Sequence, residues 1–253
     1  MNPSMVNDLP LPPVDYRKLV GSTDPGYFDN PGGQPIFPDV PAAAYASVFD
    51  FGCGCGRLAR QLIQQQPRPV RYQGIDRHKG MVDWCQGHLA TRAHGFTFSH
   101  HNVFHDTLNP GGTPGHLPLP AATADVTLFI AWSVFTHLLE EDAAFYVREL
   151  ARVLQPSGVA VTTWFLFDKG DFPMMQEFQN ALFINPLDLT NAVIFDREWV
   201  QRQLSDAGLT IVHVTPPNLR GFQWRLLLEK RPGTHCEFPE DAAPRGIQRP
   251  PAS

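Results

Sequence analysis

The sequence predicts an α/β fold: a seven-stranded, mostly parallel sheet with helices on both faces and a C-terminal antiparallel hairpin. Apolar runs of strand length alternate with segments of helical periodicity, which is typical of a parallel sheet covered by helices. The last two apolar runs, at 210–217 and 222–230, have no helical segment between them. Strands joined by a short loop pair in antiparallel orientation, so these two runs predict the hairpin.

Five strands are expected before the hairpin. Each is an apolar run bounded by glycine, proline or polar residues. The run at 124–132 is apolar at nearly every position, which is typical of a strand in the centre of a sheet. The expected strands are 46–51, 70–76, 96–103, 124–132 and 156–167.

Four helices are expected between these strands, at 57–65, 80–92, 140–155 and 196–209. The third has acids in its first turn and one apolar stripe along its length, which is the pattern of an amphipathic helix. Gly208 is expected to end the fourth helix, because glycine readily adopts the left-handed conformation found there.

Three segments lie outside this pattern. Residues 1–45 are rich in Pro, Gly and Asp, and they predict either an irregular tail or a lid over the domain at 46–231. Their aromatic residues, such as Tyr16 and Phe37, favour the lid. Residues 168–195 form an insertion longer than a plain loop, which we expect to shape a substrate site. Residues 232–253 are expected to be a disordered tail.

The composition limits the class of protein. The chain has 253 residues, 43% of them hydrophobic, which is enough for one sizeable core. The formal charge of −5, without clustered Lys and Arg, argues against a nucleic-acid partner. We find no signal-peptide pattern and no apolar run near the ~20 residues of a membrane helix. The four cysteines form no CxxC pair, so we expect reduced thiols in a cytoplasmic protein.

A glycine-rich stretch, VFDFGCGCGR at 48–57, follows the first strand. Glycine-rich turns at this place lie beneath nucleotide ligands. A dinucleotide loop has the pattern G-x-G-x-x-G, whose third glycine would fall at Arg57. We expect Asp50 at the mouth of the loop, where it would repel a pyrophosphate and favour an ammonium group. A nucleoside that carries an amino acid without phosphate fits this loop, and S-adenosylmethionine is such a molecule.

Two further strand ends carry polar groups suited to the rest of this ligand. Asp76 ends the second strand, 20 residues after Gly56, and can accept both hydroxyls of a ribose. Asn102 follows the third strand and can bind an adenine edge, and the N–H of Val103 can reach a ring nitrogen. Asp76 alone does not separate this ligand from a dinucleotide.

Over residues 46–231 the sequence resembles the class I S-adenosylmethionine-dependent methyltransferases. The stretches that carry the resemblance are VFDFGCGCGRLAR, YQGIDRHKGMVDWC, ADVTLFIAWSVFTHL, ELARVLQPSGVAVTTW and the closing strand pair. FDFGCGCGR with SVFTHL is similar to a bacterial branch of small-molecule and sugar methyltransferases. The resemblance implies a Rossmann-like fold. One departure is Asn102, where the family often has an acid.

The predicted cofactor residues combine the strand-end residues with those that the resemblance implies beneath the sulfonium, at 131–133. They are Asp50, Gly52, Gly54, Gly56, Asp76, Arg77, Met81, Asn102, Val103, Ala131, Trp132 and Ser133. We expect Tyr27, Phe28 and Trp164 to line the substrate pocket, with core packing as the rival interpretation of Trp164.

The predicted function is methyl transfer from S-adenosylmethionine to a small molecule, with an oxygen acceptor favoured over nitrogen. Alternatives are a non-catalytic S-adenosylmethionine-binding scaffold and a nicotinamide oxidoreductase; the acidic charge disfavours an RNA methyltransferase. His137, just after the fourth strand, is the candidate general base, with a capping or packing role as the alternative.

Other polar side chains have weaker functional interpretations. His100, His101 and His105 form an HHxxxH pattern, but neighbouring residues of a strand point to opposite faces, so we predict no metal site. Arg57 and Arg60 could bind an anionic substrate, although pairing with acids on a solvated helix face is the more common role of such residues.

Overall fold

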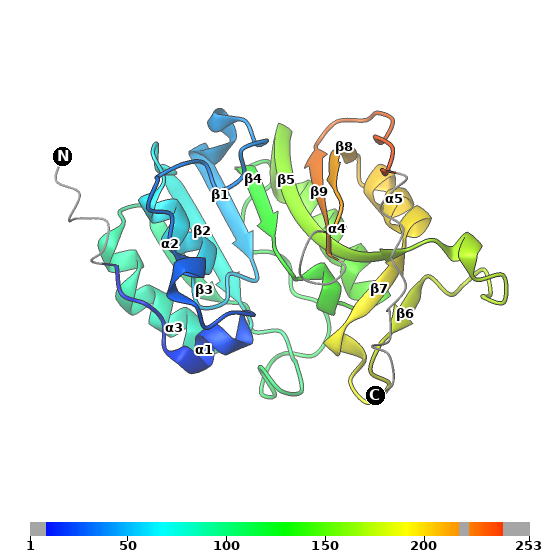
Figure 1. Cartoon of the computed structure of the whole chain (residues 1–253), viewed down its shortest axis with the longest axis horizontal. Coiled ribbons are helices and arrows are strands. Elements are labelled where there is room, and N and C mark those ends of the chain that lie inside the picture. Colours follow the sequence, from blue (N-terminus) through cyan, green and yellow to red (C-terminus); the bar gives the residue numbers. More distant parts are fainter. Residues whose placement is uncertain (1–8, 218–222, 240–253) are drawn as a thin grey trace, which may run out of the picture. The chain divides into compact units, whose positions relative to one another are not determined.

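The computed structural model describes residues 9–217 and 223–239, which form two compact units. The first unit contains residues up to Trp132 together with Arg152–Ala160, and the second contains Ser133–Ala151 and the residues from Val161 onward. Strand β5 (Leu154–Phe167) passes from the first unit into the second (Figure 1). The fold is α/β with mostly parallel strands and an antiparallel C-terminal pair, as predicted.

The first unit is built on four parallel strands, in the order β3-β2-β1-β4. They are β1 (Ser47–Phe51), β2 (Arg71–Asp76), β3 (Phe96–His100) and β4 (Val126–Ala131). In their register Asp50 lies beside Gly74 on one side and Ile130 on the other, and Asp76 lies beside His100. The carboxyl ends of the four strands therefore meet at one edge, where ligands bind in open α/β folds.

The helices of this unit are short. They are α1 (Val14–Leu19), α2 (Arg57–Gln64) and α3 (Lys79–His88), with 3-10 turns η2 (Pro25–Phe28), η3 (Ala42–Ala46) and η4 (Ala90–Arg92). Aromatic pairs fill the core, including Phe49 stacked on Phe129 with ring centroids 5.5 Å apart and Tyr72 on Phe96 at 4.8 Å. Aromatic burial of this kind contributes both apolar area and ring geometry to stability.

The second unit contains two strands that the sequence analysis did not predict, so the described residues hold nine strands rather than seven. β6 (Ala181–Phe183) pairs antiparallel with β7 (Val193–Asp196), and β7 runs parallel to β5 at Phe165–Phe167. Both new strands come from the insertion at 168–195. The apolar run of β7 is only four residues long, and the sequence analysis assigned nearly all of it to the insertion without expecting a strand there.

The helices and the C-terminal strand pair of the second unit follow the prediction, and three short 3-10 turns were not predicted. The helices are α4 (Glu140–Val153) and α5 (Arg197–Asp206), and the last two residues of α4 belong to the first unit. The turns are η5 (Phe135–His137), η6 (Lys169–Asp171) and η7 (Leu189–Asn191). The strands β8 (Thr210–Thr215) and β9 (Gln223–Glu229) pair in antiparallel orientation. Gly208 has a φ of 75°, which suits its place after α5.

Two boundaries differ from the prediction or fall partly outside the structure. Residues 232–239 were expected in a disordered tail, but they pack on the second unit: the N–H of Cys236 donates to the Ile211 carbonyl at 2.8 Å, and Phe238 contacts Trp224 edge-on. The remaining tail residues, 240–253, and residues 1–8 lie outside the described chain. Within residues 9–217 and 223–239, no helix has the length and apolar character to cross a membrane.

Candidate cofactor and active site

The glycine loop has the backbone conformation that its sequence demands. Gly52, Gly54 and Gly56 have φ angles of 78°, 54° and 81°, which side-chain-bearing residues adopt only with strain. The N–H groups of Gly52 and Cys53 both donate to the Ile75 carbonyl, at 2.8 and 2.9 Å. The loop therefore turns back over the end of β2 before α2 begins at Arg57.

The loop is also closely packed from outside. A Cβ atom at Gly54 would come within 2.6 Å of a Val20 methyl carbon, and one at Gly56 would come within 2.5 Å of a Leu89 methyl carbon. Both distances are far below van der Waals contact. A side chain at Gly54 or Gly56 would therefore require Val20 or Leu89 to move, in addition to the strain in the backbone.

Asp50 is buried near the end of β1 and is not open at the mouth of the loop as predicted. Its side chain is 1% exposed, and one carboxylate oxygen accepts a hydrogen bond from the Tyr72 hydroxyl at 2.7 Å. Burial raises the pKa of Asp50 from 3.8 to about 7; the Tyr72 hydrogen bond and the charge of Arg57 oppose this rise. A buried acid with a raised pKa is stabilised in its charged form by a nearby cation, so Asp50 suits an ammonium group.

Asp76 holds the loop in place. Its two carboxylate oxygens accept hydrogen bonds from the N–H groups of Gly54 and His78, both at 2.8 Å. The residue is half-buried, and each carboxylate oxygen can accept more than one hydrogen bond. The predicted ribose contact is compatible with this geometry, and loop positioning is a second role that the sequence analysis missed.

The end of β3 carries the predicted adenine contacts. Asn102 is exposed, and its side-chain oxygen accepts from the Asn109 amide at 3.1 Å. The N–H of Val103 donates to the His101 carbonyl at 2.7 Å, so it is not free for adenine in this structure. Met81 is buried at the start of α3, where the ring of His78 caps its N–H, and Arg77 is half-buried beside Asp76.

The three histidines of the HHxxxH pattern have separate surroundings. His100 bonds the Arg77 carbonyl at 3.0 Å, and the ring of His105 accepts from two backbone N–H groups at 3.2 Å. His101 packs edge-on against Phe51, and burial lowers its pKa to about 4. In the part of the chain that the structure describes, no three His, Cys, Asp or Glu side chains are grouped to hold a metal ion.

The end of β4 is covered by the N-terminal segment. Ala131 is fully buried, and Trp132 stacks on Phe37 with ring centroids 5.5 Å apart. We call residues 9–45 the strap. The strap therefore contacts both the glycine loop, through Val20, and the carboxyl end of β4, through Phe37.

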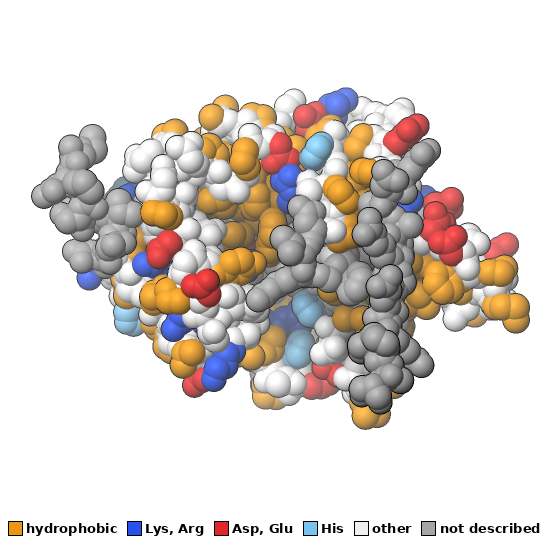
Figure 2. Space-filling view, viewed as in Figure 1, with side chains coloured by type: hydrophobic (Ala, Val, Ile, Leu, Met, Phe, Trp, Pro, Cys, Tyr) orange, Lys and Arg blue, Asp and Glu red, His pale blue; other side chains and the backbone are white. Residues whose placement is uncertain are grey.

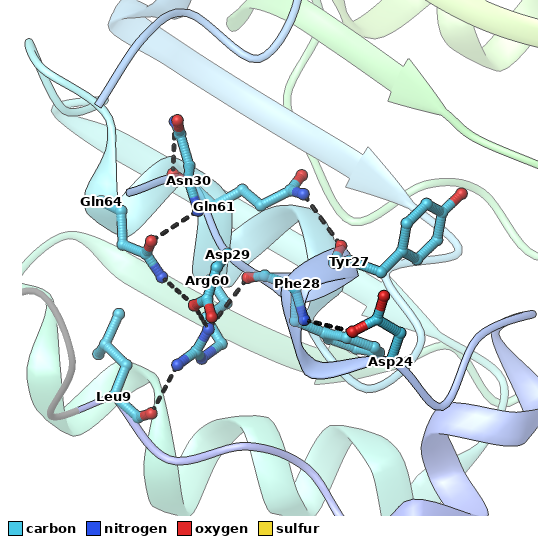
Figure 3. Close-up of polar contacts among 10 residues, drawn as sticks. Leu9, Asp24, Tyr27, Phe28, Asp29, Asn30, Arg60, Gln61 and Gln64 are labelled. Atoms are coloured by element: carbon cyan, nitrogen blue, oxygen red, sulfur yellow. Dashed lines mark hydrogen bonds and ion pairs between the residues drawn. The ribbon is translucent and has the colours of Figure 1, made fainter. Parts of the chain in front are cut away.

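The strap is fixed to α2 by polar side chains (Figure 3). Arg60 is 3% exposed; its guanidinium donates to the Phe28 carbonyl at 3.1 Å and the Leu9 carbonyl at 2.8 Å, and it pairs with the Asp29 carboxylate. Gln61 donates to the Tyr27 carbonyl at 3.1 Å. Arg60 does pair with an acid, but on a buried face, and it is not available to a substrate anion.

Two of the predicted pocket residues are core residues in this structure. Phe28 is fully buried in a cluster with Cys55 and Met81. Trp164, in the second unit, is 1% exposed and stacks on Phe135 with centroids 4.1 Å apart. Neither has surface left for a substrate. Tyr27 is 42% exposed, and its ring lies 4.7 Å from the guanidinium carbon of Arg57.

The second unit holds Ser133 and His137. Ser133 has a φ of 58°, its N–H donates to the Thr163 hydroxyl at 2.7 Å, and its own hydroxyl donates to Gln223 at 2.9 Å. His137 is exposed, and its Nδ1 lies 2.9 Å from the Thr190 carbonyl. A carbonyl only accepts, so Nδ1 carries the proton and the Nε2 of the neutral ring is left as the acceptor.

Residues 48–158 match a family model described as a methyltransferase domain. This match spans β1, the glycine loop, Asp76 and the strand ends described above. This part of the chain is therefore similar to methyltransferase domains.

Several solved structures share the fold of this chain. An S-adenosylmethionine-dependent methyltransferase from Mesorhizobium loti has 14% identity and a TM-score of 0.51, over 75% of this chain and 93% of that one. A candidate sarcosine dimethylglycine methyltransferase from Galdieria sulphuraria has 15% identity and a TM-score of 0.51, over 74% and 78%. The [4+2]-cyclase SpnF has 15% identity and a TM-score of 0.51, over 74% and 75%. At these identities the likeness shows the fold alone.

Two acidic side chains of the first unit bear on the binding of a cofactor. Asp76 has acceptor capacity beyond its two backbone contacts, and the Asp50 carboxylate, which is 1% exposed in this structure, has the charge that suits an ammonium group. The predicted cofactor residues up to Trp132 all lie in the first unit, whereas Ser133, His137 and Trp164 lie in the second. Sequence analysis missed the strap contacts of Arg60 and Gln61. The signal that could have indicated them is the place of Arg60 on the buried face of α2.

Proposed function

We propose that this protein methylates a hydroxyl oxygen of a small molecule, with His137 as the general base. When bound, S-adenosylmethionine supplies a methyl group activated by its sulfonium. Asp50 binds the ammonium of the amino-acid moiety, and Asp76 accepts the ribose hydroxyls. The observation that carries the proposal is the 2.9 Å contact between His137 Nδ1 and the Thr190 carbonyl, which leaves Nε2 to take the hydroxyl proton.

The insertion supports a small, partly apolar acceptor. Thr190, which orients His137, belongs to η7 of the insertion, and its neighbour Leu189 is 42% exposed. Further apolar side chains of the insertion are exposed, including Met174 at 88% and Leu187 at 95%, and apolar surface is visible on this part of the chain at the right of Figure 2. The acidic net charge of −5 argues against a nucleic acid in this role.

The compartment is part of the same proposal. Cys53, Cys55, Cys85 and Cys236 are all free, and three of them are buried. Free cysteines are usual in reducing compartments, which supports a cytoplasmic protein.

The test is a His137→Gln variant with His213→Gln as its control, since His213 is an exposed histidine of the same unit. Turnover with an active hydroxyl acceptor should fall about 10²–10⁴-fold in His137→Gln, mostly in kcat. Binding of S-adenosylhomocysteine should not change. Wild-type activity should decrease on acidification, because an imidazolium cannot accept a proton, and the variant should lose this dependence. Retention of more than about half of kcat would remove His137 from the mechanism.

A second candidate is an S-adenosylmethionine-binding protein without methyl transfer. It is favoured by one observation, the likeness of the fold to a [4+2]-cyclase. A panel of hydroxyl and amine compounds, with release of S-adenosylhomocysteine as the readout, separates the two. Stoichiometric binding without turnover on any compound would support the second candidate, and turnover on amines alone would indicate N-methylation.

A further inference from the structure

Exposed apolar side chains are concentrated in the insertion at 168–195. In the part of the chain that the structure describes, seven of the thirteen exposed large hydrophobic residues lie there. Four of the seven belong to residues 178–187, which we call the edge segment. They are Phe178, which is 78% exposed, Phe183 at 41%, Ile184 at 63% and Leu187 at 95%. An apolar surface of this density on a water-soluble chain usually marks a binding surface.

The strand in the middle of the edge segment has one unpaired side. β6 is the last strand at its end of the sheet and lies beside β7 (Figure 1). The N–H of Ile184 donates to the Ala192 carbonyl on the β7 side, at 3.4 Å. Because backbone groups alternate in an antiparallel ladder, those of Ala181 and Phe183 point away from β7. Among residues 9–217 and 223–239, no strand pairs with that side of β6.

The edge segment lacks the features that usually protect an open sheet edge. Lysine, proline or another charged residue on the edge strand normally prevents pairing with a second chain. The sequence of the segment is FQNALFINPL, which has no charged residue and no proline within β6. Lys169, the lysine of the insertion, donates to the Glu177 carbonyl at 2.8 Å, and Asn180 donates to the Glu140 carboxylate at 2.9 Å. The segment therefore presents mainly apolar side chains and the free backbone groups of one strand.

The charges around the edge segment indicate the kind of partner. The nearest charged residues along the chain, Glu177 and Asp188, are both acids, and they would repel an anionic lipid surface. Two copies of the segment can approach each other without placing like charges opposite one another. In an antiparallel pair centred on Leu182, Ala181 of one copy lies opposite Phe183 of the other, so the free backbone groups of the two strands match. The strand is self-complementary in this sense.

The area of the apolar surface is close to what a stable dimer needs. A large apolar side chain buries about 150–250 Å² when it is covered completely, so the four exposed side chains offer roughly 500 Å². Pro186 is exposed within the segment, and Met174, nearby in the insertion, is 88% exposed. With these residues the surface approaches the ~800 Å² that each partner buries in a standard interface. A small-molecule acceptor at His137 would cover only part of it.

We propose that this protein forms a twofold-symmetric dimer in which β6 pairs in antiparallel orientation with β6 of a second copy. The sheets of the two second units then continue across the dimer. The backbone hydrogen bonds set the register, and burial of the apolar side chains of the edge segment supplies the affinity. This inference does not depend on the proposed methyl transfer, since it concerns assembly alone.

The test is sedimentation equilibrium of the full chain over a dilution series. The wild type should be a dimer with a dissociation constant in the micromolar range or below. Leu187→Asp should weaken the dimer by about 100-fold or more, because a symmetric interface loses the contact twice and gains two like charges. Phe178→Ser should weaken it in the same direction. Val70→Asp is the matched control: Val70 is 77% exposed in the first unit, and its replacement should change the constant by less than about twofold.

Two further measurements locate the interface. Hydrogen exchange at the N–H groups of Ala181 and Phe183 should be slower in the dimer than in the Leu187→Asp monomer, because pairing with a second β6 protects them. Added NaCl should strengthen the dimer or leave it unchanged, since the acids that flank the edge segment repel their copies at low salt. Both substituted side chains are highly exposed, so the variants should keep the wild-type urea midpoint when all are measured as monomers.

Several results would overturn the inference. A wild type that stays monomeric at every concentration would do so, and so would a dimer that neither Leu187→Asp nor Phe178→Ser weakens. A dimer without slower exchange at Ala181 and Phe183 would place the interface elsewhere. If a monomeric wild type became dimeric on deletion of residues 240–253, the chain's own segment would be the occupant of this surface. A monomer that cosedimented with phosphatidylcholine vesicles would assign the surface to a lipid bilayer.

Discussion

Replacing Asp50 with asparagine should stabilise the cofactor-free protein near pH 8 and abolish tight cofactor binding. Asparagine has nearly the same size, can accept the Tyr72 hydrogen bond and does not ionise. The wild-type carboxylate must be charged at this pH in a site that is 1% exposed. The variant removes that penalty and removes the anion that the ammonium requires.

The magnitude follows from the pKa. Burial raises the pKa of Asp50 from 3.8 to about 7, so between these values the folded protein keeps a proton that the unfolded chain has lost. The folded state then binds more protons, and stability falls as the pH rises from about 4 to about 7 and is level above that. At about 1.4 kcal/mol per pKa unit, the loss is on the order of 4 kcal/mol. Asp50→Asn should recover this amount near pH 8 and almost none near pH 4.

Urea unfolding of the cofactor-free protein, followed by tryptophan fluorescence at several pH values, measures the effect. Asp83→Asn is the control, because Asp83 is an exposed acid that pairs with Lys79 within its helix, and its loss should change stability by less than about 0.5 kcal/mol. The reasoning is refuted if Asp50→Asn is less stable than the wild type near pH 8, or if the difference between them does not depend on pH.

Three other predictions follow from the same contacts. Wild-type affinity for S-adenosylhomocysteine should rise about tenfold per pH unit up to about pH 7 and then level off, since binding requires the ionised Asp50; calorimetry showing a flat profile from about pH 5 would contradict this. Asp76→Ala should weaken S-adenosylhomocysteine about 10- to 150-fold, through lost ribose contacts and a loosened Gly54; an unchanged Kd would place the ribose elsewhere. Arg60→Met should destabilise the protein by about 2–4 kcal/mol in urea unfolding and increase proteolysis within the strap, and a strap that remained resistant to protease would argue against the anchor.

The features that sequence analysis predicted well are those fixed by local chemistry. The glycine loop has three residues in the left-handed conformation within five positions, and glycine adopts this conformation most easily. The spacing of the glycines in the sequence therefore predicts the loop. Local hydrophobic periodicity also predicts the alternation of strands and helices. Helix α4, with its apolar stripe, matched the prediction closely.

The features that were missed depend on contacts between distant parts of the chain. Arg60 meets Leu9, 51 residues away, and nothing in its neighbourhood distinguishes a buried anchor from a solvated arginine. The N–H of Val103 is taken by a local hydrogen bond that a strand pattern does not reveal. Phe28 and Trp164 were placed in the pocket because aromatic residues serve both cores and binding sites, and burial is decided by packing that periodicity does not describe.

The cysteines around the glycine loop also bear on how the protein responds to thiol reagents. Burial raises the pKa of Cys55 to about 12 and raises the pKa of Cys53 and Cys85 as well, so these three sulfurs are almost entirely protonated near pH 8. Thiolates, not thiols, react with maleimides and disulfide reagents. Cys236 is only partly buried, so a reagent should modify it first.

Modification of the other three then requires the first unit to open. Their labelling rate under native conditions would report local unfolding of the loop itself, and a bound ligand should slow it in proportion to occupancy. Because Cys53 and Cys55 lie between the three glycines, the cofactor loop carries its own chemical probe, and no engineered cysteine is needed to follow its opening in solution.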